Sequence, residues 1–240
     1  MVTENQVVSI YKNDIYYDFI CEPIYRICDE SLLAVELLTH FYDERGLRKK
    51  NTAEIFESMS FRQKDFFFYC QIKKIEQQSR WFYKEKVLCS INIDNDIADI
   101  LSSNKQTSAL LSTLPFVRLE VNENYRGLGC NENIDLLQPL LKYSKGVWLD
   151  DFGAGKSTLS SINGIGFEVI KIDKEFFWQE SEKETFPSVI QAIHRSCNRI
   201  VIEGIAQREM LQTLVGLNIW GVQGYAFPSV SLNDVERLAN

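Results

Sequence analysis

The stretch Gly146-Val147-Trp148-Leu149-Asp150-Asp151-Phe152-Gly153-Ala154-Gly155-Lys156-Ser157-Thr158-Leu159 holds the strongest structural signal in this chain. A short apolar run ends in two adjacent carboxylates, and a glycine-rich loop and a Ser-Thr pair able to cap a helix follow. This order predicts a strand that brings Asp150 and Asp151 to the edge of a sheet. Because adjacent carboxylates repel each other, such a pair usually faces a metal ion or a strong hydrogen-bond network. On this stretch alone, a loop whose aspartates only cap the next turn is an equally good interpretation.

The same stretch resembles the end of a phosphate-binding P-loop. Gly155-Lys156-Ser157 lies between a predicted strand and a predicted helix, as that motif requires. The motif also needs a glycine five positions before Gly155, where this chain has Asp150. Two carboxylates would then lie where a phosphate cradle should be most electropositive. We therefore reject nucleoside triphosphate binding.

The composition indicates a folded, acidic protein. With 240 residues, 45% of them hydrophobic and 25% charged, the chain is long enough for one domain of α/β barrel size over residues 1–240. Its net charge of −7 argues against direct nucleic-acid binding, because proteins of that class need a basic surface to displace counterions from phosphate. An acidic protein can still act on a DNA-binding partner.

The sequence pattern favours a cytoplasmic location. The polar N-terminus lacks the pattern of a signal peptide, and no run approaches the roughly 18 apolar residues of a membrane span, so we expect no contact with a membrane. The cysteines have no paired spacing, and we expect them to be buried reduced thiols. They are Cys21, Cys28, Cys70, Cys89, Cys130 and Cys197.

Strands and helices are predicted to alternate along most of the chain. Strands are predicted at residues 15–28 with an interruption at Pro23, 31–38, 87–93, 116–121, 147–151, 167–172, 199–203 and 219–222. Helices are predicted to begin at 51–54 and to cover 60–79, 97–112, 134–143, 184–197 and 207–215, with a charged loop at 43–50. The apolar face of the helix over 60–79 is expected to pack in the core, although one side could be open to a partner. Its members are Phe61, Phe66, Phe67, Phe68 and Ile72.

Several predicted strands end with an acid or an amide. These residues are Glu36, Asn92, Glu120, Asp150 and Glu203. Strand–helix alternation with such strand ends predicts an α/β fold, a (β/α)₈ barrel whose site lies where the C-terminal ends of the strands converge. Four carboxylates and an amide meeting there would form an oxygen cage suited to Mg²⁺ or Mn²⁺.

Lys171 lies within an apolar run that is predicted to be the sixth strand. In the cage it could orient or deprotonate a metal-bound water. The alternative is a buried structural lysine that pairs with Asp150 or Glu203.

In these residues the chain resembles the EAL domain family over nearly its whole length. The motifs are Glu36-Leu37-Leu38, Ile91-Asn92-Ile93, Leu119-Glu120-Val121-Asn122-Glu123, Leu149-Asp150-Asp151-Phe152-Gly153-Ala154-Gly155, Ile170-Lys171-Ile172-Asp173, Ile202-Glu203-Gly204-Ile205 and Val222-Gln223-Gly224-Tyr225. The resemblance implies a modified TIM barrel whose active members hydrolyse cyclic di-GMP with two divalent metals. The implied metal ligands are Glu36, Asn92, Glu120, Asp150 and Asp151. Lys171 and Glu203 stand at the implied catalytic positions.

Two departures from the family pattern affect the groups that would hold the dinucleotide. Glu22 stands where the family has Gln before Pro23, which adds a negative charge where a dianionic ligand should lie. At an effective dielectric constant of about 20, two like charges about 4 Å apart repel by about 4 kcal/mol, or roughly three powers of ten in affinity. His40 stands where the signature continues to Arg, and a neutral imidazole lacks the bidentate fork of a guanidinium.

Further departures affect other motifs. Ala206 stands where a second Glu follows Glu203 in the family pattern, and Trp220 where an Asp usually precedes the Gln-Gly-Tyr segment. Leu37 replaces the small Ala of the signature itself. The cation-binding residues are thus mostly kept, whereas the residues expected to bind the nucleotide are altered, and such a site cannot hold the substrate in a productive pose.

This combination resembles the degenerate EAL proteins of enteric bacteria. The resemblance implies a non-enzymatic protein that binds the FlhD subunit of the flagellar master regulator FlhDC, blocks its binding to promoters and exposes it to proteolysis by ClpXP. No cofactor would then be required, and the sequence does not identify the partner-binding surface. The alternative is an active cyclic di-GMP phosphodiesterase that uses Mg²⁺ or Mn²⁺. A receptor that binds the dinucleotide without cleaving it ranks lowest, because the substitutions fall on binding groups.

Overall fold

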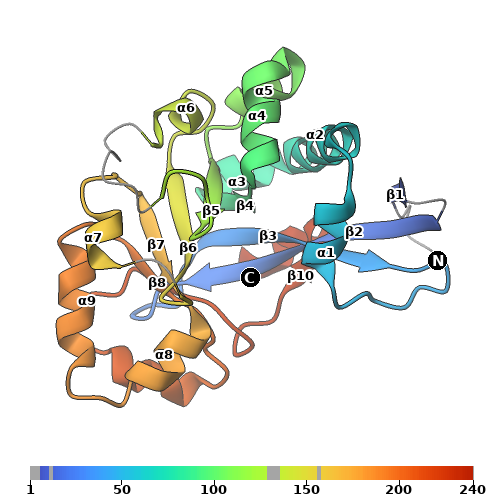
Figure 1. Ribbon diagram of the computed structural model, residues 1–240. Helices are drawn as coiled ribbons and strands as arrows, with labels where there is room; N and C mark the ends of the chain where they lie inside the picture. Colours follow the sequence, from blue (N-terminus) through green and yellow to red (C-terminus); the bar gives the residue numbers. More distant parts are fainter. Residues whose placement is uncertain (1–5, 11–12, 129–135, 156–157, 240) are drawn as a thin grey trace.

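Eight strands of the described chain close into a barrel, which confirms the predicted α/β fold (Figure 1). The computed structural model describes residues 6–10, 13–128, 136–155 and 158–239. The barrel strands are β2 (Asn13–Tyr25), β3 (Leu32–Tyr42), β4 (Leu88–Asn92), β5 (Val117–Asn122), β6 (Val147–Phe152), β7 (Val169–Ile172), β8 (Ile200–Ile202) and β9 (Gly221–Val222). Consecutive strands pair with each other, and the pairing of Tyr25 with Val222 joins β2 to β9 and closes the barrel.

The first barrel strand runs against the other seven. Strands β3 to β9 are parallel to their neighbours, whereas β2 is antiparallel to both β3 and β9. Only residues 26–31 connect β2 to β3, and a connection that short joins antiparallel strands, because parallel strands need a long crossover. The C-terminal ends of β3 to β9 therefore meet at one end of the barrel.

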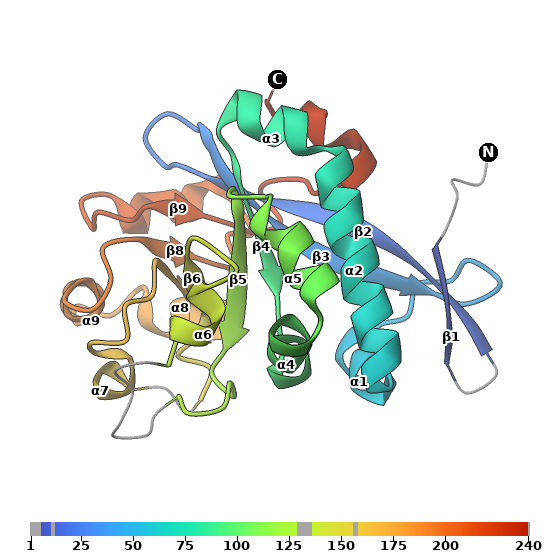
Figure 2. The ribbon, with the colours of Figure 1, turned by 90° about the horizontal axis from the view of Figure 1, so that it is seen from above.

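Strands β2 and β3 extend beyond the barrel as an arm (Figure 2). Strand β1 (Gln6–Ile10) pairs with the outer part of β2, and β10 (Val230–Ser231) pairs with its middle. Neither of these short strands was predicted. Two- to five-residue strands at the edge of a sheet carry too little periodicity to be recognised in a sequence.

Strand β2 passes through Pro23, so the predicted interruption is wrong. Pro23 pairs with Val35 on β3. On its other side, β10 pairs with Cys21 and β9 pairs with Tyr25, so no described strand pairs with Pro23 there. A proline without an N–H is tolerated at such a gap because no ladder hydrogen bond is lost.

The helices are α1 (Thr52–Ser58), α2 (Phe61–Gln77), α3 (Ser79–Glu85), α4 (Asn95–Ser103), α5 (Lys105–Ser112), α6 (Gln138–Leu141), α7 (Leu159–Ile162), α8 (Lys174–Glu180) and α9 (Phe186–His194), with 3₁₀ helices over Arg208–Leu214 and Leu232–Ala239. Several helices fall on predicted ranges, whereas α3, α8 and the 3₁₀ helix over Leu232–Ala239 were not predicted. The predicted helix 97–112 is two helices, because the side chain of Asn104 accepts hydrogen bonds from the backbone of Gln106 and Thr107 and starts a new helix. The predicted helix 134–143 begins outside the described residues, and α6 is its described part.

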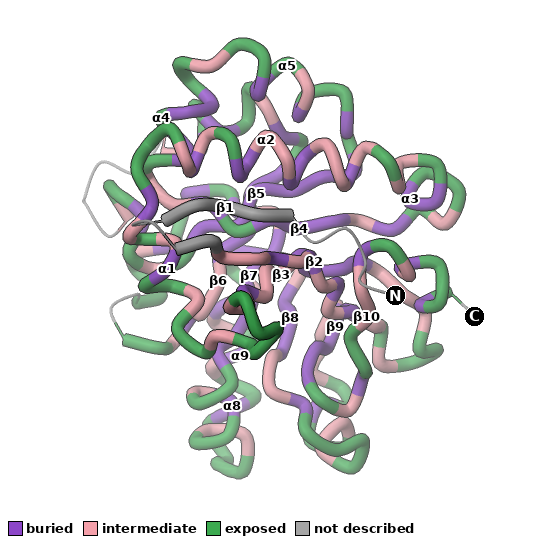
Figure 3. The backbone as a smooth tube through the Cα atoms, turned by 90° about the vertical axis from the view of Figure 1, so that its right-hand side faces the viewer, coloured by how far each residue is buried: buried purple, intermediate pink, exposed green. Residues whose placement is uncertain are grey.

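Helix α2 lays one face on the barrel (Figure 3). It begins with a capping box, in which Ser60 and Gln63 exchange side-chain and backbone hydrogen bonds. Phe67 and Phe68 are buried as predicted. Phe66 is instead 59% exposed and Phe61 is 48% exposed, so those two expected core residues lie on the surface. At 100° per residue, three consecutive phenylalanines cannot all face the barrel.

The cysteines within the described ranges are free, as expected, but not all are buried. Cys21, Cys89 and Cys197 are buried, Cys70 is half-buried and Cys28 is exposed in the β2–β3 turn. Cys130 lies outside the described residues. Among the described helices, none has the length and hydrophobicity needed to cross a membrane.

A layer of apolar side chains fills the barrel toward the N-terminal ends of its parallel strands. It consists of Ile24, Ala34, Trp148, Val169 and Val201. Two positions further along four of the strands are Glu36, Asp150, Lys171 and Glu203. Because side chains on a strand alternate between its two faces, these four also point inward and form the next layer. The apolar layer thus closes the barrel beneath a charged one.

Candidate functional site

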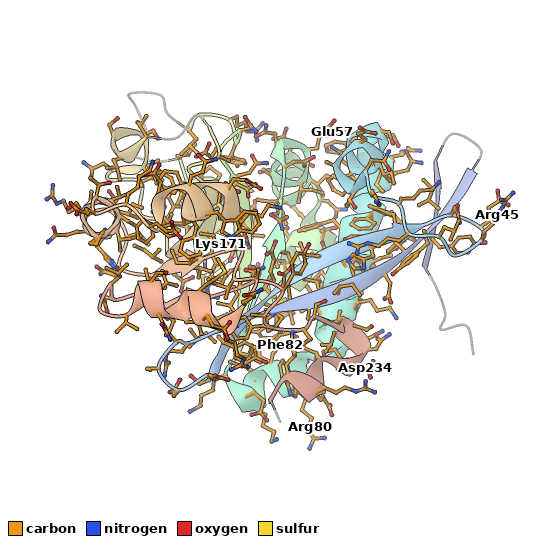
Figure 4. All side chains as sticks on the ribbon, turned by 90° about the horizontal axis from the view of Figure 1, so that it is seen from below. Arg45, Glu57, Arg80, Phe82, Lys171 and Asp234 are labelled. Atoms are coloured by element: carbon orange, nitrogen blue, oxygen red, sulfur yellow. The ribbon has the colours of Figure 1, made fainter. Side chains whose placement is uncertain are left out.

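Lys171 lies in the barrel interior (Figure 4). Four carboxylates surround it. Its Nζ is 2.8 Å from Glu36 Oε2, 2.6 Å from Glu120 Oε1, 3.0 Å from Asp150 Oδ1 and 2.7 Å from Glu203 Oε1. The structure thus brings together four predicted strand-end acids, from β3, β5, β6 and the end of β8. It also contains both of the ion pairs, with Asp150 and with Glu203, that the structural interpretation of Lys171 requires.

Glu36 is held in place by neutral donors as well as by Lys171. Asn92 Nδ2 donates to Glu36 Oε1 at 2.8 Å, and Gln223 Nε2 donates to Glu36 Oε2 at 2.6 Å. Asn92 was predicted at the site, but Gln223 was given no role. Gln223 directly follows β9 as Glu203 follows β8, so the strand-end pattern contained the signal that identifies it.

Asp150 and Asp151 take different directions at the end of β6. Asp150 accepts a hydrogen bond from Lys171, whereas Asp151 adopts a left-handed backbone with φ +56° where the β6–β7 register shifts. Burial, followed by the charge of Asp150, raises the pKa of Asp151 to about 6. The side chain that caps α7 is that of Thr158, so the interpretation of the aspartates as mere helix caps is not supported. Lys156 and Ser157 lie outside the described residues.

The electrostatics of the cluster are dominated by burial. Burial raises the pKa of Glu120 and of Glu203 well above the usual value, although Lys171 opposes the shift. Burial lowers the pKa of Lys171, but the surrounding carboxylates, Asp150 first, raise it well above its usual value overall. Lys171 is therefore an ammonium ion at neutral pH.

Glu120 is the least satisfied member of the cluster. It is fully buried, and no described residue is recorded as donating a hydrogen bond to either carboxylate oxygen. Its contact with Lys171 is an ion pair. The oxygens of such a buried carboxylate keep lone pairs that can bind a cation.

The donor set fits divalent cations. One carboxylate oxygen from each of Glu36, Glu120 and Asp150 lies within 4.8 Å of the others, and Asp150, Asp151 and Glu203 form a second such group. Oxygen-only ligand sets are preferred by Mg²⁺ and Mn²⁺. These two groups, which we call the first and second triads, share Asp150. A cation bound there would supply Lewis-acid stabilisation of negative charge on a phosphate.

Three of the altered positions lie near the C-terminal end of the barrel or beyond it. Glu22 on β2 pairs directly with Glu36 on β3, and burial followed by the charge of Glu36 raises the pKa of Glu22. His40 lies four residues beyond Glu36 on the arm, and burial followed by the charge of Arg48 lowers the pKa of His40, so its imidazole is neutral at pH 7. Ala206 is exposed in the loop after β8.

The structure places the other two altered positions outside the acid cluster. Leu37 is 2% exposed and faces α2, where it lines an apolar cavity of about 160 Å³ together with Phe67 and Phe68. Trp220 precedes β9 at the opposite end of the barrel, and its ring packs edge-on against Trp148 at 6.0 Å. Neither residue lies in the acid cluster, and their role as ligand-binding positions stays a prediction. Strand alternation turns Leu37 away from Glu36, and Trp220 lies at the N-terminal end of its strand.

A model of the EAL domain matches residues 12–229 of this chain. The putative anti-FlhC₂FlhD₄ factor YdiV of Escherichia coli (strain K12) is 28% identical over 235 residues, which cover 96% of each chain. The crystal structure of the EAL-like domain protein YdiV has a TM-score of 0.84 at 25% identity and covers 94% of this chain and 97% of that one. The PaMucR phosphodiesterase in complex with cyclic di-GMP shares the fold, with a TM-score of 0.72 at 16% identity over 91% of this chain and 94% of that one.

The family model spans the barrel strands from β2 to β9 and every residue of the acid cluster. The motifs, the barrel topology and the match over most of the length agree, and this chain therefore belongs to the EAL domain family.

Proposed function

We propose that this chain is a non-enzymatic EAL-like regulator that binds the FlhD subunit of the FlhC₂FlhD₄ transcription factor. Binding would block the contact of that complex with DNA and promote its degradation by ClpXP, and so repress flagellar genes and motility. The protein would act in the cytoplasm, where its partner binds DNA. Support comes from relatives named anti-FlhC₂FlhD₄ factor that match at 25–28% identity over 86–96% of this chain.

The observation that favours this function over catalysis is the pair Glu22 and Glu36. The two carboxylates face each other across β2 and β3 at the wall of the acid cluster. Like charges directly opposed on neighbouring strands already destabilise the pair, and an anionic ligand would add a third negative charge. A cyclic dinucleotide with two phosphates is repelled at this position, whereas a protein that docks on the outer surface is not.

The proposal is tested with purified components. The chain is mixed with purified FlhC₂FlhD₄, and complex formation is followed by size-exclusion chromatography and by calorimetry. We expect a stable complex in the presence of EDTA and without any nucleotide. Absence of binding at micromolar concentrations would overturn the proposal.

The second candidate, a cyclic di-GMP phosphodiesterase, is supported by the intact acid cluster and its two overlapping triads. It is tested by incubating the chain with cyclic di-GMP and Mg²⁺ or Mn²⁺. The proposed regulator forms no linear pGpG under these conditions. Robust turnover would establish the phosphodiesterase instead.

A further inference from the structure

The ammonium group of Lys171 overlaps the position where a cation would bind. Its Nζ contacts all three carboxylates of the first triad, Glu36, Glu120 and Asp150, at 2.6–3.0 Å. It also contacts two members of the second triad, Asp150 and Glu203. A metal ion in the first triad would therefore share every carboxylate ligand with this lysine.

The buried carboxylates of the cluster are stabilised by a cation in contact with them. Each of the four carboxylates that contact Lys171 is at most 16% exposed, and the lysine side chain is fully buried. A buried carboxylate without a compensating charge is strongly destabilising, because it loses its hydration and gains nothing in return. One buried ammonium in contact with all four carboxylates reduces that penalty for each of them.

The members of the cluster depend on Lys171 to different degrees. Glu36 accepts hydrogen bonds from Asn92 and Gln223, which are neutral and bind it whether or not the lysine is present. Glu120 has no hydrogen bond among the described residues, and its stabilising contact is the ion pair with Lys171. Loss of the ammonium would therefore affect Glu120 most.

We propose that Lys171 is a resident counter-cation: it holds the acid cluster together without a metal and weakens divalent-metal binding by competing for the same carboxylate oxygens. The barrel then keeps its fold in metal-free conditions. This role goes beyond the proposed regulatory function and does not depend on the identity of any partner. Lys171 acts here as a positioning residue, through the carboxylates that it contacts.

The test compares the wild type with Lys171→Met, which keeps the length of the side chain and removes its charge. The matched control is Lys183→Met, because Lys183 pairs with Glu180 at 2.6 Å on the surface and its own side chain is 55% exposed. Thermal midpoints are measured in EDTA and in Mn²⁺, and Mn²⁺ affinity is measured by calorimetry.

We expect Mn²⁺ to shift the midpoint of the wild type and of the control only slightly. Lys171→Met should melt at a lower temperature in EDTA, regain its midpoint in Mn²⁺, and bind Mn²⁺ at least about tenfold more tightly, because a like charge no longer opposes the ion. The proposal is overturned if the variant binds Mn²⁺ no more tightly than the wild type. It is equally overturned if Mn²⁺ stabilises the wild type as much as the variant.

A second variant covers the case in which Lys171→Met does not fold in EDTA. The double substitution Lys171→Met with Glu120→Gln removes the ammonium together with the carboxylate that depends on it most. We expect the double variant to fold in EDTA, or the single variant to fold when Mn²⁺ is present during refolding. If neither folds under these conditions, the side chain of Lys171 is required for packing rather than for charge, and the proposal fails.

Discussion

Restoring the family residues at positions 22 and 40 should restore affinity for cyclic di-GMP. The double variant Glu22→Gln with His40→Arg removes one carboxylate from the wall of the acid cluster and adds one guanidinium to the arm. Glu22 pairs with Glu36, and Glu36 lies four positions from His40 on β3, or about 13 Å at about 3.3 Å per residue. The two substitutions therefore act on different parts of the ligand. Their effects should therefore add.

The magnitude follows from the strand pairing. Glu22 and Glu36 are directly opposite, so a phosphate bound near Glu36 would lie about 5 Å from Glu22, where repulsion at a dielectric constant of about 20 is about 3 kcal/mol. Glu22 is partly exposed, and solvent screening reduces this to about 1.5 kcal/mol, which is about tenfold in affinity. A charge-assisted bond from arginine adds about 1.5 kcal/mol. Together the substitutions should raise affinity about a hundredfold.

The assay is isothermal titration calorimetry with cyclic di-GMP and Mn²⁺, with chromatography to verify that the ligand stays intact. The matched control makes the same two kinds of substitution away from the barrel mouth, as Glu182→Gln with His194→Arg. Glu182 is exposed in the turn after α8, and His194 lies at the end of α9. An affinity equal to that of the control would show that neither the charge of Glu22 nor the missing guanidinium limits binding of cyclic di-GMP.

Three other predictions concern stability. Lys64→Met should lower the free energy of unfolding by about 2 kcal/mol, because it leaves two partly exposed aspartates without their buried partner. The control Lys73→Met breaks an exposed pair and should change that free energy little, and urea titrations measure both variants. Gly224→Ala should lower the free energy of unfolding by at least about 3 kcal/mol or prevent folding, because residue 224 has φ +145° and an added Cβ would lie 2.4 Å from a backbone nitrogen. The control Gly46→Ala places its Cβ in open space at φ +76° and should lower that free energy by about 1 kcal/mol. Trp220→Asp restores the family residue yet should lower stability by about 3 kcal/mol through lost packing, and calorimetry should show no gain in cyclic di-GMP affinity.

The acid cluster could be predicted from the sequence because its residues obey a simple rule. Asn92, Asp150 and Glu203 each lie within two residues of the C-terminal end of a short apolar strand, and parallel strands bring such ends together. Glu36 joins them from the middle of β3, because that strand continues beyond the barrel as the arm. The same rule applied to the last strand would have identified Gln223. The rule fails for Trp220, because a residue that matches a motif by spacing can lie at the other end of its strand.

Other features depend on tertiary contacts that a sequence pattern does not contain. The antiparallel direction of β2 follows from a short turn, but the apolar pattern of a strand is the same in both directions. The continuation of β2 through Pro23 depends on where β9 and β10 end. The exposure of Phe66 depends on the rotation of α2 against the barrel, which three consecutive phenylalanines leave undetermined.

We infer that this chain acts by binding FlhC₂FlhD₄ and not by hydrolysing a nucleotide. The most direct measurement adds the purified chain to FlhC₂FlhD₄ bound to a fluorescent promoter fragment and follows fluorescence anisotropy in EDTA. We expect the anisotropy to fall saturably to the value of free DNA as the chain is added, with or without cyclic di-GMP. An anisotropy that stays at the value of the protein–DNA complex at micromolar concentrations of the chain would contradict this inference.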